Sequence, residues 1–515
     1  MKKETITRIV KCIITLTVIF VIMQGLSLVL KPKYYFKSDL RTPETELWDD
    51  FYNEEKNSID VFFVGSSHVY NGICPAEIYE RSGVTSFDLS TSAQNLPTAY
   101  YILKECFKYQ TPKYVFLDAH DIVNPKTVLS NYERSFDDMR WSTTKLLAEN
   151  EAIKNVLQND SMIESEKKSY FSLLMPRIFP VLDFHSRWDE VETIDFDSLE
   201  YRSILKGYCP DYKVETIVRE DYFDGSEEWL SESTEEWFSK IKSLCDDNGA
   251  AMIIMCVPYK EWNINKWNEV NDLVSKYNVP FVDFNIPDTY REIGIDDNID
   301  YLNEEHLNVY GAKKLSVYIA DSMFNSGVCG VEKRNNLPEW NELVRDWQNE
   351  CKKADFHNAV RMPEYVELLS SPDYAVMVTI NGSKCFEEGM TDETRHCLDN
   401  IGFDLSGLNG KDFLMSGISV DSQEIDMDIS LDGEESVCKT DIDGIDCWTV
   451  LNPEIVSNLY TKEFGPNSSI VIDNKDYSLH GDELNMVVYS VPDKEVIDSV
   501  YVDISYTLNV ARREE

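Results

Sequence analysis

The stretch VFFVGSSHVYNG, residues 61–72, decides how the first half of the chain is expected to fold. Four apolar residues lead into Gly65, and two serines and a histidine follow it. A short apolar run of this kind is typical of a strand that is buried on both faces of a parallel sheet. The glycine permits a tight turn, and the residues after it can point backbone N–H groups at an anion where a helix begins. The stretch therefore predicts a strand end that presents Ser66 and Ser67, either as helix caps or as a reactive hydroxyl.

Strand-like and helix-like segments alternate from about residue 59 to residue 325. Apolar runs indicate strands at 61–65, 111–120, 250–258 and 279–285. Amphipathic spacing indicates helices at 96–109, 233–249, 266–278 and 309–327. This alternation predicts an α/β domain over residues 55–328, with a mostly parallel sheet and helices on both faces. Residues 122–228 are rich in charged and aromatic side chains and predict a helical insertion.

The acidity of the chain argues against one class of partner. The 515 residues include 92 acidic and 49 basic side chains, which gives a net charge of −43. Because phosphates bind a basic face, we expect no nucleic-acid partner and interpret the acidity as a solvated surface. None of the 12 cysteines forms a C-x-x-C pair, so we expect neither a metal site nor a cofactor. The pairs Cys385/Cys397 and Cys438/Cys447 are candidates for disulfides in an oxidising exterior.

A basic N-terminus precedes nineteen residues without a charge, CIITLTVIFVIMQGLSLVL (12–30). This is about the length that a helix needs to cross a hydrocarbon core of roughly 30 Å. No A-x-A site follows, so the run predicts an uncleaved anchor, with a cytoplasmic tail and anchor over residues 1–32; the alternative is a buried core helix. Basic residues before the run favour a cytoplasmic N-terminus, although lysines after it oppose this orientation. We expect a single-pass protein of the cell membrane, with residues 12–30 in lipid and the bulk of the chain outside.

A second polar block lies far downstream, in DYLNEEHLNVYGAKKLS (300–316). A serine hydroxyl reacts only when a base lies within hydrogen-bond reach and a further group orients that base. A lone histidine is more often structural, but His306 stands just before an expected helix and is the candidate base for a serine at the strand end. His68 is expected to belong to the turn, because it directly follows the end of the strand.

The G-x-S at the strand end and the late H-L-N-x-x-G-A together resemble the SGNH (GDSL-type) hydrolase and acyltransferase superfamily. The resemblance implies a flavodoxin-like, three-layer α/β fold around a parallel sheet. It also implies that Ser67 is the nucleophile and His306 the base, with Ser66 in the variable middle place of the motif. Asn303 stands where the family has an aspartate that orients the base; its carbonyl oxygen can hold the imidazole but cannot offset the imidazolium charge. Nearby acids that could take over are Asp300, Glu304 and Glu305.

The family's oxyanion-hole residues have no clear counterparts in this sequence. The corresponding runs are SFDLSTSAQNLPTAYY (86–101) and VFLDAHD (115–121), which lack the expected glycine and the G-x-N-D motif. The remaining candidate donors would be the backbone N–H of Ser67 and, within residues 86–101, three polar residues. These are Ser92, Gln94 and Asn95. One oxyanion donor can contribute about 3 to 4 kcal/mol to catalysis, so these groups bear directly on whether the site is active.

The sequence around these blocks resembles one membrane-anchored branch of the superfamily. The anchor, Q-N-L-P-x-x-Y-Y-x-L-K-E (94–105) and H-L-N-x-x-G-A-K-K (306–314) are similar to extracytoplasmic, DltD-like proteins of Gram-positive bacteria. The branch implies a serine acyltransferase or esterase that acts on O-acyl groups of cell-wall or exported polysaccharide, with a membrane-bound O-acyltransferase as a partner. The alternative is a catalytically degenerate scaffold that binds glycan or that partner.

Residues 363–515 have a different texture and follow a charged helical connector over 329–362. Short runs of alternating character, separated by Asn, Gly, Asp and Pro, predict a separate β-rich domain with one helix at 390–402. The T-D-E helix that ends in I-G, I-D-x-K-x-Y-S (472–478) and L-N-M-V-V-Y (484–489) resemble the interleukin-like EMT-inducer (PANDER-like) domain. This resemblance implies a sandwich-like fold and glycan binding; the alternative is a structural domain without a ligand.

Overall fold

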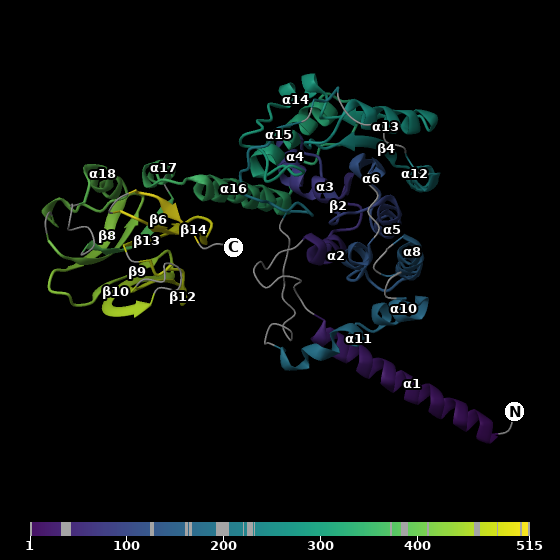
Figure 1. The fold of residues 1–515 in the computed structure, drawn as a ribbon, viewed down its shortest axis with the longest axis horizontal. Coiled ribbons are helices and arrows are strands. Elements are labelled where there is room, and N and C mark those ends of the chain that lie inside the picture. The colour runs from purple at the N-terminus through teal and green to yellow at the C-terminus, as the bar shows by residue number, and fades with distance from the viewer. Residues whose placement is uncertain are drawn as a thin grey trace. The chain divides into compact units, whose positions relative to one another are not determined.

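The computed structural model divides the chain into two compact units, Met1–Trp347 and Gln348–Glu515, which we name the α/β unit and the β-rich unit. Figure 1 draws the first in purple to teal and the second in green to yellow. The boundary lies within helix α16 (Pro338–Asn358), in the segment predicted as a helical connector. The structure describes residues 3–31, 43–123, 128–159, 163, 167–191, 205–219, 221–223, 230, 232–370, 373–382, 390–408, 411–457, 464–481, 483–504 and 507–512.

A five-stranded parallel sheet forms the centre of the α/β unit. In chain order its strands are β1 (Val61–Gly65), β2 (Ser86–Ser90), β3 (Tyr114–Asp118), β4 (Ala251–Cys256) and β5 (Phe281–Asp283). They lie side by side in the order β2-β1-β3-β4-β5, and every neighbouring pair is parallel. The prediction of a mixed α/β fold with a parallel sheet is therefore confirmed.

Helices cover both faces of this sheet, because alternate residues of a strand point to opposite sides. Val61 and Phe63 of β1 join an apolar cluster that includes residues of α4 and α15. Phe62, between them, packs edge-on against Phe51 of α2. In chain order the helices around the sheet are α2 (Pro43–Asn53), α3 (Ser67–Gly72), α4 (Pro75–Ser82), α5 (Leu96–Cys106), α6 (His120–Val123), α12 (Glu232–Asp247), α13 (Ile264–Lys276), α14 (Pro287–Ile293), α15 (Val309–Ile319) and the π-helical η3 (Ala320–Asn325).

Strand β2 was not predicted from the sequence. Its residues belong to the run 86–101, in which oxyanion donors were expected. Its sequence, SFDLS, alternates polar and apolar residues in the manner of a half-exposed strand. In the structure all five residues are buried, and Asp88 donates its backbone N–H to the carbonyl of Lys206. At Gly207 a Cβ would lie 2.3 Å from the Asp88 carbonyl oxygen, so only a glycine fits there. The outer edge of β2 is thus paired with a segment that is remote in sequence.

The predicted insertion over 122–228 contains several helices in the part that the structure describes. They are α7 (Leu129–Phe136), α8 (Thr143–Asn159), α10 (Tyr170–Ile178), α11 (Val181–Phe184) and the short 3-10 helix η1 (His185–Asp189). Residues 192–204 lie outside the described residues. At the N-terminus, helix α1 (Lys3–Leu30) contains the predicted anchor. Its segment Thr7–Leu30 is long and apolar enough to span a membrane or to act as a signal sequence.

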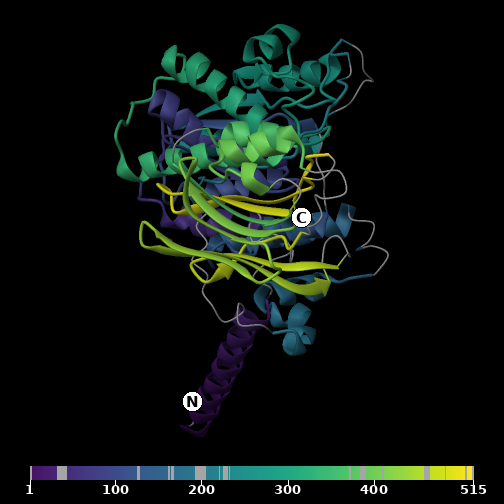
Figure 2. The ribbon, with the colours of Figure 1, turned by 90° about the vertical axis from the view of Figure 1, so that its left-hand side faces the viewer.

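The β-rich unit contains two antiparallel sheets, with strand orders β12-β11-β10-β9 and β15-β14-β13-β6-β7-β8. Val376 and Val378 of β6 pack with the helices of the unit, whereas Ala375 and Met377 face the four-stranded sheet. Figure 2 shows these layers, with the six-stranded sheet in the middle. The elements are α17 (Met362–Leu368), β6 (Tyr374–Asn381), α18 (Asp392–Asn400), η5 (Ser406–Leu408), β7 (Leu414–Val420), β8 (Gln423–Ser430), β9 (Ser436–Ile442), β10 (Ile445–Ser457), β11 (Phe464–Ile472), β12 (Lys475–Asp476), β13 (Leu484–Ser490), β14 (Glu495–Val502) and β15 (Val510–Ala511).

The sequence predicts a β-rich unit, and the structure adds a hairpin of β9 and β10 that was not singled out from the sequence. Its turn pairs Ile442 with Ile445 around Asp443 and Gly444, and both turn residues have positive φ. An Asp-Gly pair between two strand-like runs is a strong hairpin signal that the sequence does carry. The candidate disulfide cysteines Cys438 and Cys447 lie in these strands as free thiols, as does Cys397 in α18, while Cys385 lies outside the described residues.

Replacing Gly65 tests how tightly the end of β1 is packed. A Cβ at this position would lie 2.5 Å from Cγ2 of Val69 and 2.8 Å from Cβ of Asp118, neither of which is the tip of a flexible side chain. We expect Gly65→Ala to destabilise the α/β unit by about 1 to 3 kcal/mol, the usual range for overpacking. Chemical denaturation followed by tryptophan fluorescence measures this change. Gly330→Ala is the matched control, because its Cβ would meet no atom within 4 Å, and equal stability of the two variants would contradict the prediction.

Candidate active site

The two serines that follow β1 differ in how far they are exposed to solvent. Strand β1 ends at Gly65, Ser66 takes the N-cap position of α3, and Ser67 is its first residue. Ser66 makes no side-chain cap hydrogen bond, and its side chain is fully buried. Ser67 remains partly exposed. The serine that a substrate can reach is therefore Ser67.

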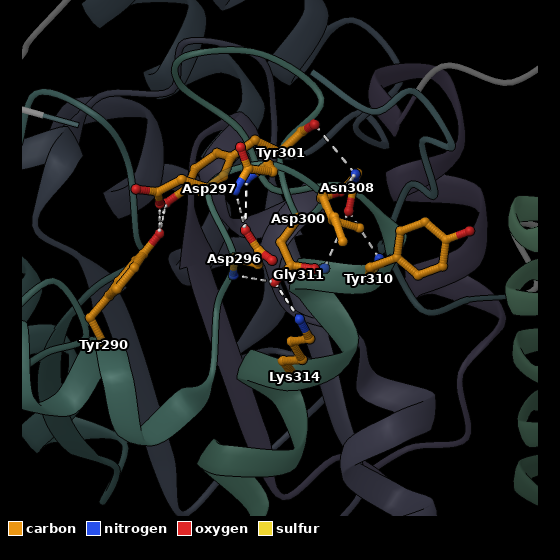
Figure 3. A network of polar contacts seen from close by, with 11 residues as sticks. Tyr290, Asp296, Asp297, Asp300, Tyr301, Asn308, Tyr310, Gly311 and Lys314 are labelled. Carbon is orange, nitrogen blue, oxygen red and sulfur yellow. Dashed lines mark hydrogen bonds and ion pairs between the residues drawn. The ribbon is translucent and has the colours of Figure 1, made fainter. Parts of the chain in front are cut away.

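The loop that carries His306 is held at one side by a buried carboxylate. Asp300 Oδ2 accepts hydrogen bonds from the backbone N–H of Asp296 at 2.7 Å and from Lys314 Nζ at 2.5 Å (Figure 3). Lys314 belongs to α15, so this contact ties the start of the loop to the helix that follows it. Burial raises the pKa of Asp300, and the hydrogen bond from Lys314 opposes that rise.

Asn308 holds the other side of the same loop. Its Nδ2 donates to the carbonyls of Ile299 at 2.6 Å and Lys213 at 3.0 Å. Its Oδ1 accepts from the backbone N–H groups of Tyr310 and Gly311, which makes it the N-cap of α15 (Figure 3). A buried amide that both caps the helix and bonds the loop fixes where His306 stands relative to α15.

Ser67, His306 and Asn303 form a continuous hydrogen-bonded chain. The distance from Ser67 Oγ to His306 Nε2 is 2.6 Å, and that from His306 Nδ1 to Asn303 Oδ1 is 2.9 Å. The backbone N–H groups of Glu305 and His306 also donate to Asn303 Oδ1, at 2.9 and 3.0 Å. Because backbone N–H groups can bond only to an acceptor, they fix the amide with its oxygen toward the imidazole. The ring then carries its proton on Nδ1 and presents the Nε2 lone pair to the serine.

Two of the three acids considered as substitutes for the family aspartate have other partners. Asp300 is engaged with Lys314 and the Asp296 backbone, and Glu304 forms an ion pair with Lys260. Glu305 is exposed, and its backbone N–H donates to Asn303. The atom that contacts His306 Nδ1 is the amide oxygen of Asn303.

The side chains considered as oxyanion donors have structural roles in two of three cases. Gln94 accepts from the Thr91 hydroxyl at 3.0 Å and donates to the carbonyl of Leu89 at 3.3 Å. Asn95 is the N-cap of α5, and its Nδ2 donates to the Tyr132 hydroxyl at 3.1 Å. Their amides are buried among these partners, so the expectation that they meet an oxyanion is not supported. Ser92 is partly exposed in the turn after β2.

The register of the sheet brings that turn close to Ser67. Gly65 of β1 pairs with Ser90 of β2, so the residues that follow both strands leave the sheet at the same edge. Backbone N–H groups in the first turn of a helix have no acceptor within that helix, and Ser67 begins α3. Backbone donors at these two strand ends are the groups that the geometry offers to an oxyanion.

A polar cluster lies behind Ser67. Ser66 Oγ contacts Nδ1 of His68 and Nδ1 of His120, at 3.3 Å each. The two imidazole rings have centroids 3.9 Å apart, and the His68 ring lies 5.0 Å from that of His306. The sequence predicts that His68 belongs to the turn and points to no role for His120. Both residues follow the ends of strands that pair with each other, β1 and β3. Only knowledge of the strand order could have placed them together.

The ligand atoms of His68, Asp118 and His120 lie within 4.8 Å of one another, and all three residues are buried. Two imidazoles and one carboxylate are a donor set that zinc and related ions accept. The Ser66 hydroxyl already contacts both Nδ1 atoms, so hydrogen bonding accounts for how the two rings are placed. The expectation of no metal site stays a prediction.

No known protein family matches the chain, and no curated protein matches it. Function is therefore inferred from the chemistry of the site.

The pH dependence of stability tests the buried state of Asp118. Burial, with the Asp121 carboxylate adding to it, raises the pKa of Asp118 to about 7. In an unfolded chain the pKa is about 4, so between these values only the folded protein keeps the proton, and stability falls as pH rises through this window. At about 1.4 kcal/mol per pH unit the loss reaches at most roughly 4 kcal/mol. Asp118→Asn is neutral at every pH and removes this loss.

We therefore expect the melting temperature of Asp118→Asn, relative to wild type, to be higher at pH 8 than at pH 5. Thermal unfolding followed by tryptophan fluorescence measures it, with the exposed Asp247→Asn as the control that keeps the wild-type profile. A parallel pH dependence of wild type and Asp118→Asn would show that Asp118 does not titrate in this window.

Proposed function

We propose that the protein is an SGNH-type serine acyltransferase or esterase in which Ser67 is the nucleophile and His306 the base. The observation that carries this proposal is the chain of hydrogen bonds from Ser67 Oγ through His306 to Asn303 Oδ1, at 2.6 and 2.9 Å. A serine needs both a base and an orienting group to react at neutral pH, and these contacts supply both. The order of the parallel sheet adds support, because flavodoxin-like sheets are wound in the order 2-1-3-4-5.

The residues act in two half-reactions. Ser67 Oγ attacks the carbonyl carbon of an acyl ester and its proton moves to His306 Nε2. That proton then passes to the leaving alcohol, and an acyl-serine remains. A sugar hydroxyl, or water, attacks the acyl-serine and gives its proton to His306, which returns it to Ser67 Oγ as the C–O bond to the serine breaks. Asn303 keeps the imidazole aligned throughout, through the hydrogen bond to Nδ1.

The proposed setting is the outer face of a cell membrane, with α1 as a single-pass anchor and an O-acylated cell-wall or exported polysaccharide as the substrate. A membrane-bound O-acyltransferase would be the partner that supplies or receives the acyl group. Helix α1 supports this setting, since Thr7–Leu30 is long and apolar enough to span a bilayer. The β-rich unit, with its two antiparallel sheets, would bind glycan. The strong negative charge of the chain, −43, fits a partner that is not a polyanion.

A second candidate function is a degenerate SGNH scaffold that binds glycan or the partner acyltransferase without catalysis. It is favoured by two observations. Asn303 places a neutral oxygen where an imidazolium would need a negative charge. Gln94 and Asn95, which could have met an oxyanion, are engaged in structural hydrogen bonds.

A fluorophosphonate probe separates the two functions, because only an activated serine reacts with it. We expect the wild-type chain to be labelled and to hydrolyse 4-nitrophenyl acetate, and Ser67→Ala to lose both by at least about a hundredfold, since the nucleophile is removed. Ser66→Ala is the matched control, and we expect it to keep the label because its hydroxyl is buried. Absence of label in the wild type would favour the scaffold, and label that persists in Ser67→Ala would show another nucleophile.

Substitution of Asn303 tests how the orienter works. In Asn303→Asp the carboxylate would accept the same backbone hydrogen bonds and also offset the imidazolium charge, so we expect esterase kcat to rise about tenfold, or roughly 1.4 kcal/mol in the barrier. Asn303→Ala removes the acceptor at Nδ1, and we expect kcat to fall by about a hundredfold. Asn248→Asp, an exposed residue after α12, controls for added charge. Equal rates for Asn303→Asp, Asn303→Ala and wild type would sink this role.

A further inference from the structure

The turn between α10 and α11 is docked on helix α1 through the polar side chains of an otherwise apolar stretch. Between Val18 and Leu30 of α1 the polar side chains are Gln24 and Ser27. Gln24 Nε2 donates to the carbonyl of Ile178 at 2.7 Å, and Ser27 Oγ accepts from the backbone N–H of Val181 at 3.0 Å. Both of these side chains therefore satisfy backbone groups of the turn between α10 and α11.

The remaining backbone groups of this turn also have partners. Phe179 donates its N–H to the carbonyl of Met175, Pro180 has no N–H to satisfy, and the Phe179 and Pro180 carbonyls accept from Leu182 and Asp183. Non-helical backbone is tolerated at the depth of a bilayer only where protein satisfies it, because an unpaired group in hydrocarbon costs several kcal/mol. The turn meets this requirement although it lies next to an apolar helix on the surface of the unit.

The contacts made with α1 change from apolar to polar toward its C-terminal end. Phe179 lies edge-on to Phe20, with ring centroids 5.6 Å apart. Phe20 precedes Leu30 by ten residues, or about 15 Å of helix, which is about half of a hydrocarbon core roughly 30 Å thick. At the end of α1 the contacts become polar: Arg187 donates to the Leu30 carbonyl at 2.7 Å, and Lys31 pairs with Asp138 at 2.6 Å. An apolar contact at depth and charged groups at the end match the profile of a bilayer leaflet.

The segment from Tyr170 to Asp189 also exposes several large apolar side chains, as a surface that contacts lipid does. Phe171 is 70% exposed and Trp188 is 73% exposed, and Met175 and Leu182 are exposed as well. Figure 1 places α11 beside the end of α1 that leads into the α/β unit, and most of the large apolar side chains of α1 from Ile9 to Leu28 are themselves exposed.

We infer that residues 170–189 form a second membrane element, which inserts among the lipid acyl chains of the leaflet where α1 ends. The α/β unit is then held at the membrane by α1 and by this segment together, rather than tethered by a flexible stem. Because Gln24 and Ser27 complete the turn, α1 belongs to the mature fold; a cleaved signal sequence would leave the Ile178 carbonyl and Val181 N–H to be satisfied in another way. This inference does not depend on the proposed catalytic activity.

Site-specific photocrosslinking in vesicles tests the inference on the full chain. A benzophenone amino acid replaces Phe171 in one variant and Phe223 in the other, because the two side chains are equally exposed, at 70% and 71%. Phe223 follows Tyr222, whose hydroxyl bonds Asp283 on the edge strand β5. The protein is reconstituted in vesicles of phosphatidylcholine and phosphatidylglycerol, irradiated and analysed by mass spectrometry.

We expect lipid adducts at position 171 to exceed those at position 223 at least fivefold. Equal adduct yields, or crosslinks from position 171 mainly to a second copy of the chain, would overturn the inference. In the position-171 background, Gln24→Leu should lower the lipid adduct severalfold by leaving the Ile178 carbonyl without its donor. Thr17→Leu is its control, since the Thr17 hydroxyl bonds the Ile13 carbonyl of its own helix. No difference between these two variants would show that the polar contact does not seat the segment.

Discussion

The hydrogen bond between Ser67 and His306 is the interaction on which the candidate site depends, and it joins residues 239 positions apart. Nothing local holds these side chains together. Ser67 is placed by the close packing of Gly65 at the end of β1, and His306 by a loop that Asp300 and Asn308 tie to α15. The distance of 2.6 Å between Ser67 Oγ and His306 Nε2 therefore depends on the packing of the parallel sheet and of α15.

The candidate site has a neutral hydrogen-bond acceptor beside His306 and buried titratable groups behind Ser67. Asn303 holds the imidazole of His306 through an oxygen that two backbone N–H groups fix in place. Behind the serine, His68 and His120 share the Ser66 hydroxyl, and burial raises the pKa of both Asp118 and Asp121. A site assembled this way relies on fixed geometry more than on a full charge beside the base, which is the form of preorganisation that low dielectric surroundings reward.

Paired polar groups also hold the C-terminal part of α1 to the rest of the α/β unit. Gln24 and Ser27 are costly in an apolar helix unless they are paired, and the α10–α11 turn has backbone groups that need partners. The hydrogen bonds between the two side chains and the turn satisfy both sets of polar groups. In the proposed setting, a site on a body held at two places would meet a membrane-bound or wall-bound substrate at a fixed height, as positioning requires.

The sequence by itself determined the alternation of strands and helices, the apolar N-terminal helix, and the choice of Ser67, His306 and Asn303 as a set. The alternation and the apolar helix follow from local periodicity, whereas the set of Ser67, His306 and Asn303 follows from the resemblance of two short motifs to the SGNH superfamily. The sequence did not determine β2, whose outer edge pairs with a segment near Gly207, or the roles of Gln94 and Asn95. Nor did it join His68 to His120, because those residues meet only where β1 pairs with β3. Adjacency of strand ends is set by sheet order, and sheet order is decided by tertiary packing.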